Sequence, residues 1–261
     1  MMLDNVKEEN PIVEGDKNIV TSVEGNEQNI MQDFYNIIKG NNEPFVIIGF
    51  IDDNISKVDQ EEAIEMVESL EEIQERYLDD YGGQLFAEDY QGELISLVMA
   101  QESLLFLDED KIDEIENAKL KDLVERIIGG KYKLINLEGS LYPLIDYEGL
   151  KVYDKYLSDE MRDYIDIKAM DSNHPTIIDA EIIPVDELAE RIIKVEDYLK
   201  KHPKDGRYEK VLRLYGTYIN FYLGGSDNSP IYEYDTKKIK DEVLSSYKKI
   251  ATKQDMIISH I

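Results

Sequence analysis

Tyrosine and carboxylate side chains concentrate between residues 142 and 153, in a chain with eighteen tyrosines, six phenylalanines and no tryptophan. Tyr142, Asp146, Tyr147, Glu148 and Tyr153 supply three phenol rings and two carboxylates. A tyrosine ring has an apolar face and a polar hydroxyl group, so tyrosines beside carboxylates suit sugars, peptides or cationic ligands. The sequence predicts a ligand-binding site at these five residues. The alternative is that tyrosines at helical spacing line the edge of a core.

Paired carboxylates such as these can also hydrolyse glycosidic bonds, provided that a fixed distance separates them in a cleft. Sequence alone supplies no such distance. The three histidines are His174, His202 and His260, and none has the neighbours of a metalloprotease or of a nucleophilic triad. His174, in a loop before Pro175, is the one histidine that a site could use, against the alternative of an ordinary loop residue. The sequence therefore predicts no catalytic residue.

Two segments resemble ligand-binding loops and fail on their spacing. Counted from Asp108, a calcium loop would need an oxygen ligand where Ile112 stands and a glutamate where Lys119 stands. This acidic run is better explained as the start of a helix, where the helix dipole favours negative charge. The glycine pair 129–130 is no phosphate loop, because Glu125 replaces its first glycine. We expect no metal and no cofactor.

The overall composition restricts the partners. Lysine and arginine number 29 and aspartate and glutamate 57, which gives a net charge of −28. Such a charge opposes binding to nucleic-acid phosphates and to anionic lipid, and it leaves a protein or a cell-wall component as the expected partner. The absence of cysteine excludes disulfides, thiolate nucleophiles and cysteine-ligated metals. The oligomeric state is left open.

The location of the protein is predicted from weaker signals. No run of about 18 apolar residues is present, so the sequence predicts no transmembrane segment. The polar opening of the chain is no signal peptide, and it is typical of a chain that starts after a removed leader or lipid anchor. Together with the missing cysteine, it predicts an extracytoplasmic or cell-surface protein of a Gram-positive-like bacterium. A cytoplasmic protein is the alternative.

The elements that must position these residues are mostly helices. Residues 1–25 show no periodicity and are predicted to be an N-terminal tail, followed by a single helical domain over 26–261. The clearest helix begins at Asp59, which with Glu62 forms a capping box. Its apolar residues recur every three or four positions, at Ala63, Met66, Leu70, Ile73 and Tyr77.

Further boundaries follow from glycines, prolines and changes of period. Residues 45–55 are predicted to be a helix rather than a buried strand. Residues 79–83 are predicted to end the Asp59 helix. The later helices are expected at 84–105, 110–128, 146–157, 158–171, after Pro184, after residue 206 and at 236–253. Residues 131–145 alternate and predict a small β-hairpin or loop, with a sub-boundary near 130–146. The fold class is all-α, with antiparallel helical hairpins packed as an irregular bundle or a short solenoid.

One segment resembles a known family. Residues 198–212 contain Tyr-Leu, two lysines, a turn with His202 and Pro203, and the start of another helix. This arrangement resembles the turn of tetratricopeptide-like helical hairpins in bacterial envelope proteins. The resemblance covers residues 186–224, the length of one repeat, and the small residues typical of such a repeat are mostly missing. It implies stacked antiparallel helices with a protein-binding concave surface.

Three functions are compatible with these observations. The leading hypothesis is a non-enzymatic helical interaction or ligand-binding protein of the cell envelope or a secreted one. A second is a hydrolase that uses Asp or Glu on carbohydrate, which needs two convergent carboxyls in a tyrosine-lined cleft. A third is a cytoplasmic acidic mimic of nucleic acid, which needs charges clustered on one face at phosphate-like spacing.

Overall fold

The structure is a computed structural model that describes residues 24–253 and 257–260. The predicted N-terminal tail, residues 1–25, lies almost entirely outside this range. The chain is mostly helical (66%) with two small antiparallel strand pairs, in agreement with the predicted all-α class with a β-hairpin insertion.

The elements follow one another along the chain. The α-helices are α1 (Glu24–Lys39), α2 (Pro44–Asn54), α3 (Gln60–Leu85), α4 (Tyr90–Met99), α5 (Ala118–Gly129), α6 (Tyr147–Leu150), α7 (Asp159–Asn173), α8 (Val185–Lys201), α9 (Tyr208–Gly224) and α10 (Asp241–Ile250). Short 3-10 helices cover Ile55–Lys57, Glu109–Glu114, Lys151–Tyr156 and Ile257–His260. The strands are β1 (Tyr132–Leu137), β2 (Ser140–Ile145), β3 (Ile177–Ile178) and β4 (Glu181–Ile182).

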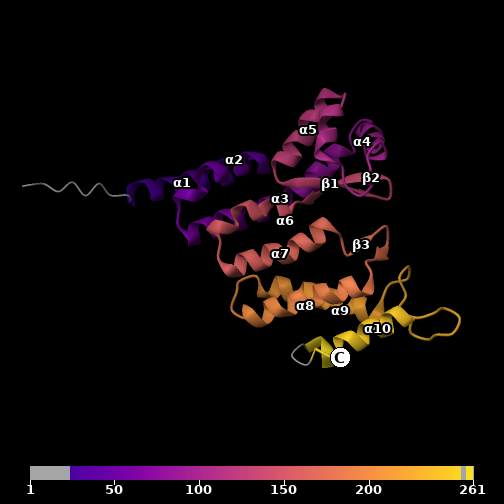
Figure 1. Cartoon of the computed structure of the whole chain (residues 1–261). Helices are drawn as coiled ribbons and strands as arrows, with labels where there is room; N and C mark the ends of the chain where they lie inside the picture. Colours follow the sequence, from indigo (N-terminus) through magenta and orange to yellow (C-terminus); the bar gives the residue numbers. More distant parts are fainter. Residues whose placement is uncertain (1–23, 254–256, 261) are drawn as a thin grey trace, which may run out of the picture.

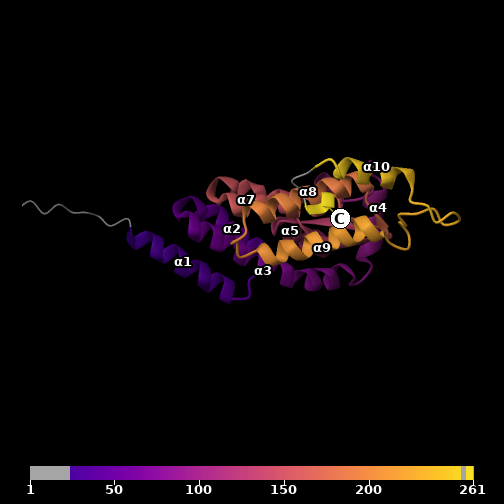
Figure 2. The ribbon, with the colours of Figure 1, turned by 90° about the horizontal axis from the view of Figure 1, so that it is seen from below.

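The helices are stacked largely in chain order. In Figure 1, α6, α7, the α8–α9 pair and α10 follow one another downward, and α4, α5 and the β1–β2 hairpin lie at the upper right. Figure 2 shows α8, α9 and α10 running along a common direction. Helix α8 packs against α7, α9 and α10, so it is central to the C-terminal half. Every helix in the described part is too short or too polar to cross a membrane.

The predicted β-hairpin is present. Strands β1 and β2 pair antiparallel, and Leu137 lies opposite Ser140 at the turn. The turn residues Glu138 and Gly139 both have positive φ, 49° and 81°, as a two-residue hairpin turn with the twist of its strands requires. The hairpin packs against α3, α4 and α5. Residues 45–55 are helical as predicted: residues 45–54 lie in α2, and Ile55 begins the following 3-10 helix.

Helix α3 begins with the predicted capping box. The amide of Glu62 donates to Asp59 Oδ1 at 2.9 Å, and the amide of Asp59 donates to Glu62 Oε2 at 3.2 Å. These two bonds satisfy two amides that the first turn of a helix leaves without partners.

We expect Asp59→Ala to lower the free energy of unfolding by about 1 kcal/mol, because the amide of Glu62 loses its acceptor. Urea unfolding followed by circular dichroism measures this change. Glu72→Ala is the matched control, because Glu72 is exposed in the middle of the same helix. Equal losses in the two variants would contradict the role of the cap.

Several predicted helix boundaries are wrong. Residues 79–83 do not end α3, which continues to Leu85 because Tyr81 and Leu85 are fully buried and their packing outweighs the low helix propensity of two glycines. The predicted helix over 84–105 is shorter, because the chain turns at Glu88, whose φ is 50°. Helix α10 starts at Asp241, since residues 232–239 form a turn closed by a Tyr232–Ile239 bridge.

A buried carboxylate on α8 holds the C-terminal segment. Glu196 is 1% exposed and accepts hydrogen bonds from the Tyr215 hydroxyl at 2.8 Å and from the backbone amides of Ile257 and Ile258. Lys200 lies 2.7 Å from the same carboxylate. Burial acts to raise the pKa of Glu196, but these donors outweigh burial and hold the pKa below its usual value.

Candidate functional site

The five predicted ligand-binding residues separate into four places. Asp146 and Glu148 lie at the surface, where Lys133 contacts Asp146 at 3.2 Å and donates to Asn173 Oδ1 at 2.8 Å. Asn173 in turn donates to Glu148 Oε2 at 3.1 Å. The two predicted carboxylates thus belong to one chain of polar contacts between the hairpin, α6 and α7.

The outer tyrosines of the prediction lie elsewhere. Tyr142, on β2, is 39% exposed and its ring lies 5.2 Å from the ring of Phe86. Tyr153 is buried and donates its hydroxyl to Asp52 Oδ1 at 2.7 Å. Neither side chain contacts the Asp146–Glu148 pair, so the structure does not bring the five residues together.

Tyr147 belongs to a different cluster, which is the best candidate for a site. Its hydroxyl donates to Glu71 Oε1 at 2.6 Å, and the hydroxyl of Tyr164 donates to the same oxygen at 2.6 Å. Glu71 comes from α3, Tyr147 from α6 and Tyr164 from α7. All three side chains are buried, and Glu71 is 3% exposed. The cluster therefore joins three helices through one carboxylate oxygen.

The electrostatics of this cluster keep the tyrosines protonated. Burial raises the pKa of Tyr147 and of Tyr164 far above the ordinary value, and the adjacent Glu71 carboxylate raises both further. Both phenols therefore act as hydrogen-bond donors at any physiological pH. The second oxygen of Glu71 lies 3.7 Å from Lys210 Nζ, on α9.

A groove opens beside this cluster, between α3, α7 and α9. Its volume is about 340 Å³. It is lined by Glu75, Tyr164, Ile167, Lys168, Lys210, Val211, Arg213, Leu214 and Thr217. We call it the α3–α7–α9 groove. Its volume lies at the lower end of the range of about 300–1,000 Å³ found for small-molecule sites.

Two cationic side chains at or near the groove lie over tyrosine rings. Lys168 Nζ lies 4.9 Å from the centre of the Tyr147 ring, a cation–π contact. Arg207, at the start of α9, lies over the Tyr164 ring and makes ion pairs with Glu68, at 2.8 Å, and with Asp205. Helices α9 and α3 thus meet through the Arg207–Glu68 and Lys210–Glu71 pairs.

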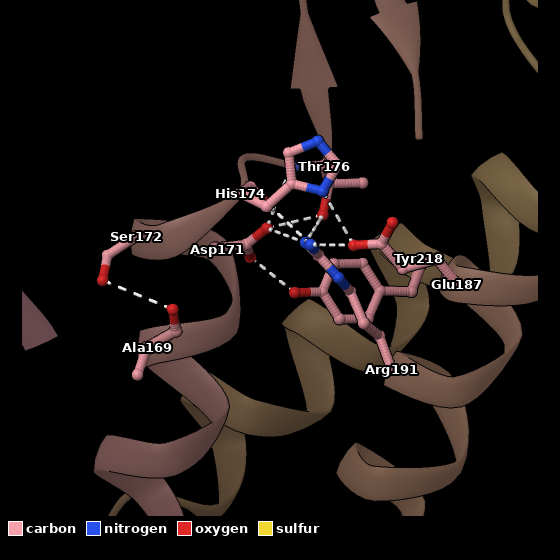
Figure 3. Close-up of polar contacts among 8 residues, drawn as sticks. All are labelled: Ala169, Asp171, Ser172, His174, Thr176, Glu187, Arg191 and Tyr218. Atoms are coloured by element: carbon pink, nitrogen blue, oxygen red, sulfur yellow. Dashed lines mark hydrogen bonds and ion pairs between the residues drawn. The ribbon is translucent and has the colours of Figure 1, made fainter. Parts of the chain in front are cut away.

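A second polar cluster surrounds Arg191, on α8 (Figure 3). Its guanidinium donates to Asp171 Oδ1 at 2.8 Å, to Thr176 Oγ1 at 2.9 Å and to Glu187 Oε1 at 2.8 Å. It also donates to the backbone carbonyl of His174. The side chain of Arg191 is 4% exposed, and each carboxylate is 34% exposed. Arg191 therefore connects the end of α7, the following loop and α8.

The same cluster contains the histidine that the sequence singled out. His174 Nδ1 lies 2.9 Å from Glu187 Oε1, the oxygen that also accepts from Arg191. Tyr218, on α9, donates to the other oxygen of Asp171. Burial acts to raise the pKa of Glu187, but the contacts with His174 and Arg191 outweigh burial and lower it. These carboxylates are held by Arg191, so the cluster acts as a lock between helices.

Among the residues that the structure describes, no three histidine, aspartate or glutamate side chains come together so that they could hold a metal ion. No family model, no curated protein and no solved structure matches this chain.

Sequence reasoning found Tyr147 but missed its partner on α3 and the groove. Glu71 follows the buried Leu70 and lies four positions after the buried Val67, so it continues the buried face of the helix. An acidic residue on the buried face of a helix could have indicated this cluster from the sequence. Lys168, Lys210 and Arg213 carry no such signal, because they are ordinary polar-face residues in the sequence of α7 and α9.

Proposed function

We propose that this protein is a non-enzymatic helical binding protein and that the α3–α7–α9 groove takes up a small organic ligand. The observation that carries the proposal is the composition of the groove. The buried side chains of Ile167 and Val211, together with Leu214, form an apolar part of the lining that we call its floor, and charged side chains from three helices also line it. Small-molecule sites combine an apolar lining with a few placed polar groups in this way.

The geometry favours binding over hydrolysis. A glycosidase needs two carboxyl groups on either side of the bond that it breaks. Glu75 is the one carboxylate among the described residues that line the groove, since Glu71 lies behind Tyr164 and is nearly inaccessible. One oxygen of Glu71 is occupied by two phenol hydroxyls, which removes it further from a substrate. The acidic-mimic hypothesis remains an alternative without an observation that favours it.

The finer architecture and the location belong to the same proposal. We place the helices in antiparallel hairpins, packed as a short solenoid or irregular bundle, and the α8–α9 pair as a tetratricopeptide-like unit. Helices α8 and α9 pack together and are joined by a short turn, which supports this view. An extracytoplasmic location remains a prediction supported by the absence of cysteine.

Filling the groove tests the proposal. Thr217 is exposed and lines the groove, so Thr217→Trp should occupy it without disturbing the core. In a thermal-shift screen of small acids, amines and neutral compounds, we expect ligands that raise the Tm of the parent but not that of Thr217→Trp.

Thr252→Trp is the control, because Thr252 is exposed beyond α10, at a distance from the groove residues along the chain. It should respond to each ligand as the parent does. The proposal is wrong if no compound raises the Tm of the parent, or if Thr217→Trp is stabilised as much as the parent.

A further inference from the structure

We propose that the α3–α7–α9 groove selects a small organic anion, a carboxylate or phosphate attached to an apolar body. This inference rests on the proposed binding function and names its ligand class.

The charge balance of the groove is opposite to that of the chain. Lys168, Lys210 and Arg213 line the groove together with the carboxylate of Glu75, and Glu71 lies 3.7 Å from Lys210 Nζ, so three cations meet two carboxylates. In the whole chain, acidic residues outnumber basic ones by 57 to 29. If the basic residues were scattered evenly over the acidic surface, three of them would not be expected around one groove with an apolar floor. The groove is therefore a positive site on a negative molecule.

Two of these cations are held at the groove by buried groups. Lys210 Nζ faces the second oxygen of Glu71, and the first oxygen is fixed by the hydroxyls of Tyr147 and Tyr164. Lys168 Nζ is held over the ring of Tyr147. The buried cluster described above thus contacts the ammonium groups of two residues that line the groove and acts as a support for them. Such a support reduces the entropy that the lysines lose when an anion binds.

The third cation is free to bind. Among the described residues, the guanidinium of Arg213 makes no ion pair and no hydrogen bond, although its backbone carbonyl accepts from Thr217. A guanidinium binds a carboxylate or a phosphate through two parallel N–H···O bonds, while an ammonium acts as a point charge. Arg213 with Lys210 would then supply both kinds of recognition to one anionic group.

The remaining features limit the size and the charge of the ligand. The apolar floor and the volume of about 340 Å³ suit a body of the size of a phenyl ring with a short side chain. An engineered apolar cavity of about 150 Å³ already binds benzene. The net charge of −28 repels a long polyanion, whose outer charges would lie over the acidic surface. A small anion with one or two charges meets the groove without this penalty.

The proposal is tested with four probes of similar size and different charge: phenylacetate, phenyl phosphate, benzyl alcohol and benzylamine. Titrations of the ¹⁵N-labelled full chain, followed by NMR, give the Kd and the residues affected. We expect the two anions to shift amide signals of α7 and α9, with a Kd that rises as salt is added. Benzyl alcohol and benzylamine should bind at least tenfold more weakly.

Variants separate a binding role of the cations from a structural one. Lys210→Gln and Arg213→Gln should each weaken anion binding about tenfold, the loss expected for one charge-assisted contact. Lys204→Gln is the control, because Lys204 is an exposed lysine in the α8–α9 turn that does not line the groove. It should leave the Kd unchanged. If Lys210→Gln and Arg213→Gln lowered the Tm but kept the parent Kd, the cations would be structural and the inference would be wrong.

The probes also distinguish this inference from the proposed function. Binding of benzylamine or benzyl alcohol at α7 and α9 as tight as that of the anions would overturn the anion class and leave the binding function intact. If no probe shifts signals at the groove, the anion class is wrong, and the thermal-shift screen with Thr217→Trp then decides whether the groove binds another class of ligand.

Discussion

Arg191→Met should lower the free energy of unfolding by about 3 kcal/mol. Removing one partner of a buried ion pair typically costs about 3–5 kcal/mol, because the other charge is left without compensation. We expect a loss at the lower end of this range, because Asp171 and Glu187 are each 34% exposed and partly solvated. The substitution also leaves the Thr176 hydroxyl oxygen and the backbone carbonyl of His174 without the donor that Arg191 supplies. Chemical unfolding of the purified variant measures the loss.

The neighbouring lysine on the same helix supplies the matched control. Lys194 is 48% exposed and lies 3.9 Å from Asp166, so Lys194→Met should change the stability by less than about 1 kcal/mol. Arg191→Lys keeps the positive charge but loses the planar guanidinium with its several N–H donors. Its free energy of unfolding should lie between those of the parent and of Arg191→Met. A loss below about 1 kcal/mol in Arg191→Met would show that the cluster does not lock the helices.

Glu71→Leu should lower the free energy of unfolding by about 2–4 kcal/mol. The substitution leaves the hydroxyls of Tyr147 and Tyr164 buried without an acceptor, and each such group costs about 1–3 kcal/mol. It also releases Lys210 from its position at the groove. Thermal and urea unfolding measure the stability, and the same samples show whether the helical content is kept.

A triple variant separates the hydrogen bonds from the packing. Replacing both partners of a hydrogen bond by apolar groups of similar shape can be nearly neutral. We therefore expect Glu71→Leu combined with Tyr147→Phe and Tyr164→Phe to regain most of the stability that Glu71→Leu loses. If the triple variant is as unstable as the sum of its single changes, the hydroxyl–carboxylate bonds are not what Glu71 contributes.

Local features of the fold were predictable because they depend on neighbouring residues. The capping box at Asp59 needs a carboxylate three positions away, and the hairpin needs a turn between two short alternating runs. The capping box was predicted and is present, and the hairpin, which was predicted as an alternative to a loop, is also present. The end of α3 was predicted wrongly, because the burial of Tyr81 depends on distant partners, among them Glu43 and Tyr132. The helix propensities of residues 79–83 carry no information about these tertiary contacts.

The candidate site was only partly predictable, since its members are brought together by tertiary packing. Tyr164 meets Glu71 across 93 positions of the chain. The sequence placed the site where acids meet tyrosines, and the structure does join tyrosines to an acid. The acid is Glu71 of α3, rather than the neighbouring Asp146 or Glu148. Those two carboxylates are near Tyr147 in sequence but point to surface partners.

The carboxylate of Glu196 has a consequence for the order in which the protein matures during synthesis. Two of its hydrogen-bond donors, the amides of Ile257 and Ile258, are 61 and 62 positions later in the chain. The ribosome adds roughly 5–20 residues per second, so the pair α8–α9 emerges several seconds before these donors. Of the four donors described here, Tyr215 and Lys200 are the two already present during that interval. Residues 257 and 258 therefore complete the hydrogen bonds of a buried carboxylate that is synthesised earlier.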